Sequence, residues 1–201
     1  MTAGNPGASG ATEGNATTRS ARSAARPFSG AGRLRDGTPV RFRPLVAGDR
    51  DLLLAGFTAL SDRSRRSRFL RGVSDAQFER MLPVLLDTVD QQSHVALLLY
   101  VGARPIGLGR LRRFPSDPSV ADLAVTIADD WHGRGAGTVL AQELLARGGS
   151  VREIQTVVGQ DNPASLRMLA RLGRLRSDCV SGSCDVVVQI SSAAATGADA
   201  A

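Results

Sequence analysis

The stretch Asp130-Trp-His-Gly-Arg-Gly-Ala-Gly-Thr138 decides how the rest of this sequence is interpreted. It follows an apolar run over 123–127, which predicts a strand, and it leads into a helical pattern over 138–147. Glycines between a strand and a helix let successive backbone N–H groups converge, and the helix adds the positive end of its dipole. The stretch therefore indicates a binding site for phosphate oxygens, although a tight turn between strand and helix would show the same pattern.

The spacing of the glycines excludes the dinucleotide-binding fingerprint G-x-G-x-x-G. Counted from Gly133 the sixth position is Thr138, and counted from Gly135 it is Leu140. Composition excludes two further classes, because all 25 basic residues are Arg and the sequence has no Lys. A Walker-type phosphate loop and a Schiff-base enzyme both need a lysine amine.

The remaining composition argues against a metal, a membrane and a nucleic-acid partner. Two His and two Cys are too few for the usual structural zinc site, so no metal is expected. The longest apolar run, over 95–101, has seven residues, whereas a membrane-spanning helix needs about 20. Residues 36–190 hold twenty Arg and seventeen acidic residues, a net charge of only +3, so nucleic acid is not expected. With no apolar leader visible, the sequence predicts a cytoplasmic protein.

Composition also divides the chain into three segments. Residues 1–32 consist mainly of Ala, Gly, Ser, Thr and Asn, and they contain no Leu, Ile or Val. Such a segment cannot bury enough apolar surface to offset the entropy of ordering it, so we expect a disordered arm. Residues 191–201 have a similar composition and are expected to form a disordered tail. The folded domain is therefore expected over 33–190.

Strand and helix patterns alternate within the expected domain. Runs typical of strands lie at 39–44, 94–100, 106–114, 123–127, 154–158, 174–180 and 184–190. Helical patterns lie at 49–60, 61–70, 74–86, 138–147 and 163–172. The third helix opens with a capping box, Ser74-Asp-Ala-Gln77, and Pro83 predicts a kink or an early end. The order predicts a mixed α/β (α+β) domain, with helices on both faces of a mostly antiparallel sheet of about seven strands.

Two motifs resemble those of the GNAT acetyltransferase superfamily. His132-Gly-Arg-Gly135-Ala-Gly137 resembles its pyrophosphate loop, (Gln/Arg)-x-x-Gly-x-(Gly/Ala), with His in place of Gln or Arg. Asp161-Asn-Pro-Ala-Ser-Leu-Arg-Met-Leu-Ala-Arg-Leu-Gly173 resembles its late motif, Asn-x-x-(Ala/Ser)-x-x-Leu-(Tyr)-x-x-x-Gly-Phe. The resemblance covers about 33–190. Segments 33–44, 60–69 and 121–125 look most like the GNAT domain of bacterial Pat-type protein lysine acetyltransferases.

The resemblance implies an N-acetyltransferase that moves an acetyl group from acetyl-CoA to a primary amine, with a protein lysine as the acceptor. Amides of the glycine loop would bind the pyrophosphate, and the edge of the 123–127 strand would bind the pantetheine amides. Asn162, which fits the N-cap of its own helix, would also touch the pantetheine arm. The residues expected to bind acetyl-CoA are Val125, Thr126, Ile127, His132, Gly133, Arg134, Gly135, Ala136, Gly137, Thr138 and Asn162.

Asp122 occupies the position where Pat-type enzymes carry a Glu, so the resemblance makes it the candidate general base for the acceptor ammonium. A free Asp, with a pKa near 3.9, is a weak base, so either burial raises its pKa or a water relays the proton. The alternative is a strand-end Asp that faces solvent.

The acid for the departing thiolate has no evident candidate. Many members of the family use a Tyr seven residues after the motif Asn, and here that position is Leu169. The one Tyr of the chain, Tyr100, lies on another predicted strand. We therefore expect no protein acid, or a water in its place, with a backbone N–H near Val125 holding the oxyanion.

The histidines and one arginine cluster allow two interpretations. His132 could shuttle protons or simply be solvated, and His94 is expected to be structural. Five arginines lie on the 61–71 segment. They form either a solvated helix face paired with Asp residues or a binding site for an anion. The anion would be the 3′-phosphate of CoA or an acidic protein substrate. The five are Arg63, Arg65, Arg66, Arg68 and Arg71.

Other local features carry structural expectations. Asp129 and Asp130 are expected to form a solvated rim of the glycine loop. Cys179 and Cys184 could face each other across a hairpin, but a cytoplasmic protein favours reduced thiols. The helix over 138–147 is short for the family, which we expect to loosen the adenine end of the cofactor site.

Two rival functions stay open beside the protein lysine acetyltransferase. One is a small-molecule amine acetyltransferase, and the other is a non-catalytic acyl-CoA-binding regulatory module, favoured by the missing Tyr and by Asp at position 122. An Arg-rich nucleic-acid binder is the least favoured reading. The expected partners are acetyl-CoA and an acceptor protein or small amine, with no membrane; the sequence names neither an acyl-chain preference nor an oligomeric state.

Overall fold

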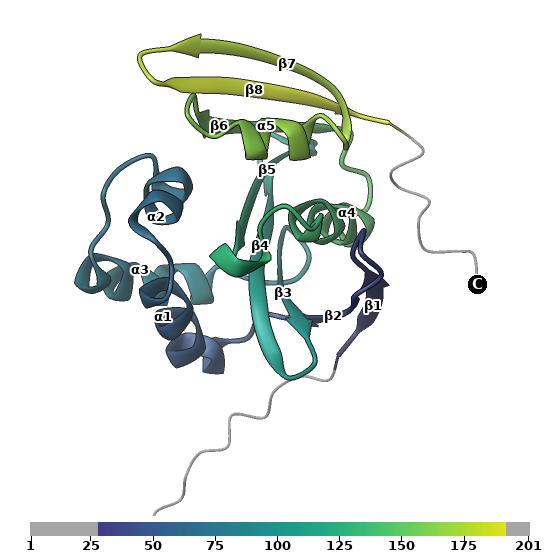
Figure 1. The fold of residues 1–201 in the computed structure, drawn as a ribbon. Helices are drawn as coiled ribbons and strands as arrows, with labels where there is room; N and C mark the ends of the chain where they lie inside the picture. Colours follow the sequence, from purple (N-terminus) through teal and green to yellow (C-terminus); the bar gives the residue numbers. More distant parts are fainter. Residues whose placement is uncertain (1–27, 192–201) are drawn as a thin grey trace, which may run out of the picture.

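The computed structural model describes residues 28–191, so the expected arm up to residue 27 and the tail from 192 lie outside the described residues. Within them, eight strands form one sheet in the order β1-β2-β3-β4-β5-β6-β8-β7 (Figure 1). Neighbours are antiparallel except β5 and β6, which run parallel. The strands are β1 (Gly30–Arg33), β2 (Pro39–Pro44), β3 (His94–Val101), β4 (Arg104–Phe114), β5 (Asp117–Ile127), β6 (Glu153–Gly159), β7 (Gly173–Val180) and β8 (Ser183–Ile190).

Helices cover both faces of the sheet, which confirms the predicted mixed architecture (Figure 1). On one face lie α1 (Arg50–Thr58), α2 (Asp62–Phe69) and α3 (Asp75–Asp87); on the other lie α4 (Ala136–Gly148) and α5 (Pro163–Leu169). Two 3-10 turns, η1 (Ala47–Asp49) and η2 (Asp129–Trp131), precede α1 and the glycine loop. The buried apolar side chains form one cluster on each face of the sheet.

β1 is one strand more than the sequence led us to expect, and it begins inside the segment expected to be a disordered arm. Its four residues, Gly-Ala-Gly-Arg, have little strand propensity of their own. The strand forms because β2 offers a free edge, on which Gly30 pairs with Phe42. Arg147 of α4 adds hydrogen bonds to the hydroxyl and the carbonyl of Ser29, at 2.8 and 2.9 Å. Tertiary partners therefore decide this element.

The helix α4 packs directly against β4 because that strand lacks side chains where the two meet. A Cβ atom on Gly109 would lie 2.6 Å from Leu144 Cδ1, closer than atoms can approach. Leu140 and Leu144 are fully buried at this contact. The close approach fixes where the first turn of α4 stands relative to the neighbouring strand β5.

The helix α3 keeps its predicted start but runs past Pro83 to Asp87. The Ser74 hydroxyl accepts from the Gln77 N–H at 3.3 Å, and the Gln77 side chain accepts from the Ser74 N–H at 2.8 Å, so the capping box is confirmed. Pro83 lies on the exposed side of the helix, where water can satisfy the carbonyl that loses its N–H partner. The buried Phe78 and Leu82 hold the helix against the sheet on the other side.

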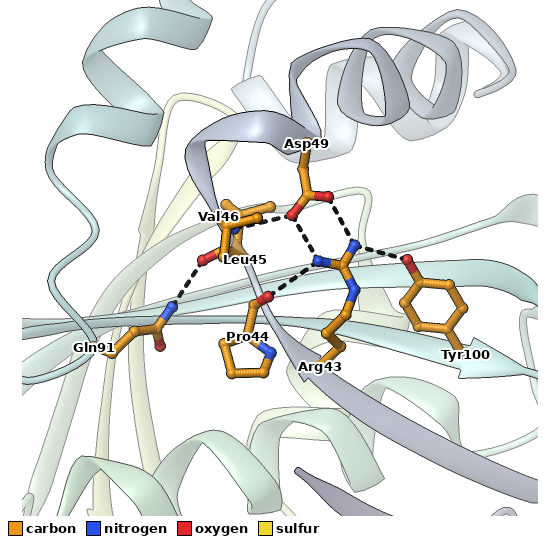
Figure 2. A network of polar contacts seen from close by, with 7 residues as sticks. All are labelled: Arg43, Pro44, Leu45, Val46, Asp49, Gln91 and Tyr100. Carbon is orange, nitrogen blue, oxygen red and sulfur yellow. Dashed lines mark hydrogen bonds and ion pairs between the residues drawn. The ribbon is translucent and has the colours of Figure 1, made fainter. Parts of the chain in front are cut away.

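A buried ion pair joins β2 to the start of α1 (Figure 2). The guanidinium of Arg43 donates to both carboxylate oxygens of Asp49, at 2.7 and 3.0 Å, and to the Tyr100 hydroxyl at 2.9 Å. Burial disfavours the charge of Arg43, but the hydrogen bonds to Asp49 and Tyr100 outweigh it and raise the pKa of Arg43. Asp49 also accepts from the Val46 N–H at 2.9 Å, so the pair fixes the turn into the α1–α3 layer.

The hairpin β7–β8 carries a disulfide, so the expectation of reduced thiols is wrong for this structure. Cys179 and Cys184 are direct cross-strand partners in the register, and their sulfur atoms are bonded. The short turn between the strands brings the two side chains together, which the hairpin pattern had allowed. Separately, no helix within residues 28–191 has the length and apolar character needed to cross a membrane.

Candidate functional site

The strands β5 and β6 diverge after a short parallel ladder. Val120 pairs with Glu153 and Ala121 with Ile154, and the ladder ends there. Both strands continue toward their carboxyl ends, while β6 remains paired with β8 along its whole length. The edge of β5 beyond Ala121 is therefore left without a backbone partner strand (Figure 1).

Hydrogen bonds identify which backbone groups of β5 lie on this unpaired edge. The carbonyl of Leu123 accepts from the Thr156 hydroxyl of β6 at 3.3 Å, so odd-numbered residues point toward β6. The N–H of Ala128 donates to Ile106 of β4 at 2.8 Å, so even-numbered residues point the other way. Because backbone groups alternate along a strand, the N–H and C=O of Val125 face the diverging side. These two groups are free to pair with an extended ligand that carries amides.

The glycine loop presents free N–H groups beside this edge. Gly133 and Gly135 have φ values of +77° and +89°, a left-handed backbone that favours glycine, and Gly135 is the N-cap of α4. The first intrahelical bond of α4 closes on the Gly135 carbonyl, so the N–H groups of Ala136, Gly137 and Thr138 have no partner within the helix. The predicted convergence of amides at a helix N-terminus is therefore present.

The helix itself is longer than the sequence suggested. It starts at Ala136, two residues before the predicted start, and runs through Gly148 for 13 residues. The expectation of a short helix is therefore wrong, and the loosened adenine end inferred from it loses its basis. A small residue such as Gly137 fits the first turn because it faces Val125, Ile127 and Met168, to which a Cβ would stand 3.7–3.9 Å away.

An arginine that the sequence analysis did not single out lies across the loop. Arg35 donates from its guanidinium to the Gly133 carbonyl at 2.5 Å, and its backbone N–H donates to Arg134 at 3.3 Å. Arg134 stacks over the Trp131 ring at 4.7 Å and lies 3.8 Å from the Asp36 carboxylate. Two guanidinium groups therefore stand beside the N-terminus of α4, where they add positive charge to the helix dipole.

His132 fastens the loop to the end of β5. Its Nε2 is 2.9 Å from the Ile127 carbonyl, and its Nδ1 is 3.9 Å from the Asp129 carboxylate. The Ile127 carbonyl is thereby occupied by the loop itself. Neither contact gives His132 the role of a proton shuttle, so that interpretation has no support in the geometry.

Asp129 and Asp130, which follow β5, were expected to form a solvated rim of the glycine loop. Instead, both make bonds to other residues. Asp129 accepts from the N–H and hydroxyl of Ser61, at 2.8 and 3.0 Å, and from the hydroxyl of Ser64 at 2.5 Å. Burial opposes its ionisation, but the bonds from Ser64 and Ser61 prevail and lower the pKa of Asp129. Asp130 pairs with Arg104 at 2.7 Å. Asp129 thus holds the start of α2 against the end of β5.

Asn162 caps α5, as predicted from its motif. Its Oδ1 accepts from the Ser165 N–H at 3.1 Å, and its Nδ2 donates to the Ser165 hydroxyl at 2.8 Å. Leu169, at the position where many family members carry Tyr, is buried in the core. Tyr100 is buried with its hydroxyl bound to Arg43, so it is not available at the diverging edge.

Asp122 lies in the middle of β5, half-buried, on the face covered by α1–α3. It is directly opposite Arg112 of β4, and Ala124 is opposite Arg110. Opposed residues share a face of the sheet, so these arginines lie on the same face as Asp122. The Asp122 side chain makes no hydrogen bond or ion pair with any residue between 28 and 191. The alternative of a strand-end Asp in solvent does not match this position.

His94 has the structural role that the sequence suggested, and it orients Arg110. It is only 2% exposed, and its Nδ1 lies 3.0 Å from the Thr88 carbonyl. Burial, and then the charge of Arg110, lower the pKa of His94, so the ring is neutral. Its Nδ1–H therefore donates to Thr88, and its Nε2 accepts from Arg110 Nε at 3.0 Å.

The five arginines of the 61–71 segment split into two groups. Arg65 is paired with Asp75 at 2.8 Å and donates to the carbonyls of Thr58 and Leu60, which matches the Asp-paired interpretation. The other four have no ion pair with a described residue. Of these, Arg68 is half-buried, and Asp122 is the charge that acts on it. It therefore stands on the Asp122 side of the sheet, away from the first turn of α4.

An open groove of about 700 Å³ lies at the carboxyl end of α2. Its walls are the end of α2, the loop after β6 and the turn of the β7–β8 hairpin. The lining residues are Arg66, Leu70, Arg71, Gly159, Gln160, Asp161, Ser181, Gly182 and Ser183. Elsewhere, no cluster of three or more His, Cys, Asp or Glu suited to a metal occurs within residues 28–191.

Comparison with known proteins identifies relatives of this chain. Residues 57–173 match the family model described as the acetyltransferase (GNAT) family. An acetyltransferase of Pseudomonas aeruginosa is 34% identical over 145 residues, covering 70% of this chain and 77% of the relative. The acetyltransferase Pat of Mycolicibacterium smegmatis is 29% identical over 144 residues, and the match covers 70% of this chain but only 42% of Pat. The crystal structure of the GNAT domain of S. lividans PAT shares the fold, with a TM-score of 0.67 and 21% identity over 80% of this chain and 96% of that domain.

Proposed function

Because the chain belongs to the GNAT acetyltransferase family, and is thus an acyltransferase, we propose that it transfers acetyl from acetyl-CoA to a primary amine of a protein lysine. One observation carries the proposal: the unpaired edge of β5 leads to the free amides at the N-terminus of α4. An extended donor with amides at one end and phosphates at the other fits both features. The same reaction on a small amine is the nearest alternative.

In this proposal the donor lies along β5 with its pyrophosphate at the glycine loop. Free N–H groups of residues 134–138 bind phosphate oxygens, because a helix N-terminus favours anions. The N–H and C=O of Val125 pair with pantetheine amides as a further strand would. Thr126, whose backbone groups face β4, and Ile127, whose carbonyl is bound by His132, complete the strand. We assign Asn162, the N-cap of α5, to the same ligand. His132 and Gly133 shape the loop and hold it at the end of β5.

The reaction requires a neutral amine and a path for its proton. The amine nitrogen attacks the thioester carbonyl carbon, and the C–S bond breaks as the amide forms. We assign to Asp122 the removal of the ammonium proton through a water. Residues three apart on a strand are separated by about 10 Å, so a short carboxylate at 122 needs that relay to serve an acetyl group near Val125. The N–H of Val125 is the candidate donor to the oxyanion.

The departing thiolate takes its proton from water in this scheme. Leu169 is buried and Tyr100 is committed to Arg43, so neither position supplies an acid. The same fact favours one rival function, a module that binds acyl-CoA without turnover. The cytoplasmic location also stays a prediction, and the Cys179–Cys184 disulfide is the feature that speaks against it.

Calorimetric titration with acetyl-CoA and with CoA, followed by a thiol-release assay with lysine peptides, tests the proposal. We expect saturable one-to-one binding of both nucleotides, and thiol release that depends on the peptide. Binding without thiol release for any amine would point to the non-catalytic module. Absence of binding at millimolar concentration would contradict the assignment of the glycine loop.

A further inference from the structure

The surroundings of Asp122 carry more positive than negative charge. Arg68 of α2 and Arg110 and Arg112 of β4 act on this carboxylate or on one another. His94, which packs against Arg110, is neutral. Three guanidinium groups and one carboxylate therefore lie on one face of the sheet, at the place where the proposed function puts a cationic substrate. A lone lysine ammonium would be repelled from such a site.

Two of these guanidinium groups are half-buried and have donors without an acceptor among the described residues. Arg68 is half-buried and has no hydrogen bond or ion pair with any described residue; its one aromatic contact is with the Phe69 ring, 5.1 Å away. Arg110 uses its Nε on His94, and its terminal nitrogens bind no residue of the described range. Burial, and then repulsion by Arg68, lower the pKa of Arg110 to about 10. Donors of this kind, on half-buried guanidinium groups without a protein acceptor, are available to an anion from outside the protein.

The placement of the two groups suits an anion that arrives together with the acceptor. Arg110 is opposite Ala124, next to Asp122 on the same face of β5, and Arg68 reaches this face from α2. This face is opposite to α4, so it is not the side on which the amides of the glycine loop lie (Figure 1). We therefore take the anion to be part of the acceptor, since the amides assigned to the donor phosphates lie at the start of α4, on the other face.

The groove at the end of α2 extends the same charge pattern. Arg66 and Arg71 line it on the side of α2, and Asp161 is the one acidic residue among its lining residues. The Leu70 side chain, between them, approaches Gly159 of β6. Two arginines against one acidic residue give this groove a net positive charge. Both features favour an acceptor segment of negative charge.

We propose that the acceptor amine carries a carboxylate beside it, and that Arg68 and Arg110 bind this carboxylate while Asp122 faces the amine. The inference rests on the proposed acetyltransferase function. Guanidinium groups pair with carboxylates through two parallel hydrogen bonds, which the free donors of Arg68 can supply. A Glu next to the modified lysine of a protein and the α-carboxylate of a free amino acid offer the same chemistry.

The test compares three acceptors in the thiol-release assay: the peptide acetyl-Gly-Glu-Lys-Glu-Gly-amide, its counterpart with Gln for both Glu, and free lysine. We expect the native protein to favour the Glu peptide over the Gln peptide by about tenfold or more in kcat/KM, since hydrogen bonds between charged groups are worth that much. Higher salt should reduce the preference by raising KM. A preference for free lysine over both peptides would identify the α-carboxylate as the source of the anion.

Variants then assign the preference to residues. Arg68→Gln and Arg110→Gln should each lower kcat/KM for the Glu peptide far more than for the Gln peptide, and Arg68→Lys should keep part of the preference. Arg63→Gln is the matched control, because Arg63 is an exposed residue of the same helix with no described contact. Circular dichroism establishes whether each variant is folded. If Arg68→Gln does not fold, Arg110→Gln alone tests the inference.

Three results would overturn the inference. Equal rates on the two peptides with the native protein would show that no acidic neighbour is recognised. An equal loss on both peptides in Arg68→Gln would assign Arg68 a structural role. If the protein binds acetyl-CoA but acetylates none of the acceptors, the proposed function fails first and takes this inference with it.

Discussion

At the scale of single residues, Asp122 combines a proposed role in proton transfer with an unusual setting, a half-buried carboxylate among arginines. We expect Asp122→Asn to lower kcat by about 100-fold or more, the usual contribution of a general base, while acetyl-CoA binds as before. Asp122→Glu should retain activity, because the longer side chain reaches closer to the amine. Steady-state thiol release and calorimetry measure the two effects. Asp178→Asn, an exposed change on β7, is the control; turnover unchanged in Asp122→Asn would contradict the assignment.

The buried pair of Arg43 and Asp49 makes a prediction about stability. Arg43→Ala leaves the Asp49 carboxylate buried and unpaired, so we expect the free energy of unfolding to fall by about 3–5 kcal/mol. The exposed pair Arg50–Glu79 offers a matched comparison, and Arg50→Ala should cost no more than about 1 kcal/mol. Urea unfolding followed by circular dichroism measures both. Similar losses in the two variants would mean that the buried pair does not hold the α1 layer to the sheet.

At the scale of elements, the glycine loop makes a prediction that separates strain from ligand contact. Gly135 has φ +89°, and a Cβ there would lie 3.1 Å from Arg35 Cγ. We expect Gly135→Ala to cost about 1 kcal/mol of stability and to weaken acetyl-CoA binding by about tenfold, because Arg35 and the first amides of α4 must shift. Gly37→Ala is the control: its φ is +82° with open space around it, so it should cost similar stability and leave binding unchanged. Equal binding by both variants would contradict the cradle.

Local elements were predicted well because their signals are local. The capping box of α3, the Asn162 cap of α5 and the glycine N-terminus of α4 each lie within a few residues of sequence. β1 was missed because Gly-Ala-Gly-Arg becomes a strand only on the edge of β2. The end of α3 was predicted within one residue, but the early end that Pro83 allowed did not occur, because Pro83 lies on the exposed side of the helix.

The site was predicted in part, for the same reason. The loop and the strand edge follow from motif and order along the chain. The bonds between Asp129 and Ser61, 68 residues apart, and the contact of Arg35 with Gly133, 98 residues apart, have no signal in local sequence. The position of Arg68 relative to Asp122 is likewise set by how α2 packs on the sheet. Pairings of this kind require the fold.

At the scale of the whole molecule, the buried His94 makes the stability of the fold depend on pH. Its pKa is lowered in the folded protein, by burial and then by Arg110, below the value of about 6.5 expected in the unfolded chain. Above that pH the ring is neutral in both states and contributes nothing. As the pH falls below about 6.5, the unfolded chain binds a proton that the folded protein resists, so stability decreases. His94→Gln should flatten this decrease between pH 7 and 5 in thermal melts; superimposable profiles for the two proteins would exclude the effect.

Because the ladder between β5 and β6 is short, the sheet consists of two parts, strands β1–β5 and strands β6–β8, which are joined at that ladder. Two residue pairs form the backbone ladder between β5 and β6, and beyond it the Thr156 hydroxyl still bonds to the Leu123 carbonyl before the two strands diverge. A ligand bound between the diverging strands would bridge the two parts, with bonds to Val125 of β5 and to α5, which follows β6. We expect acetyl-CoA to slow hydrogen exchange of β6 and β8 amides as much as those of the glycine loop, measured by mass spectrometry of peptic fragments. If acetyl-CoA slowed exchange in the glycine loop alone, the ligand would not contact the part of the sheet formed by β6–β8. If the donor binds as proposed, it also stiffens the junction between the two parts of the sheet.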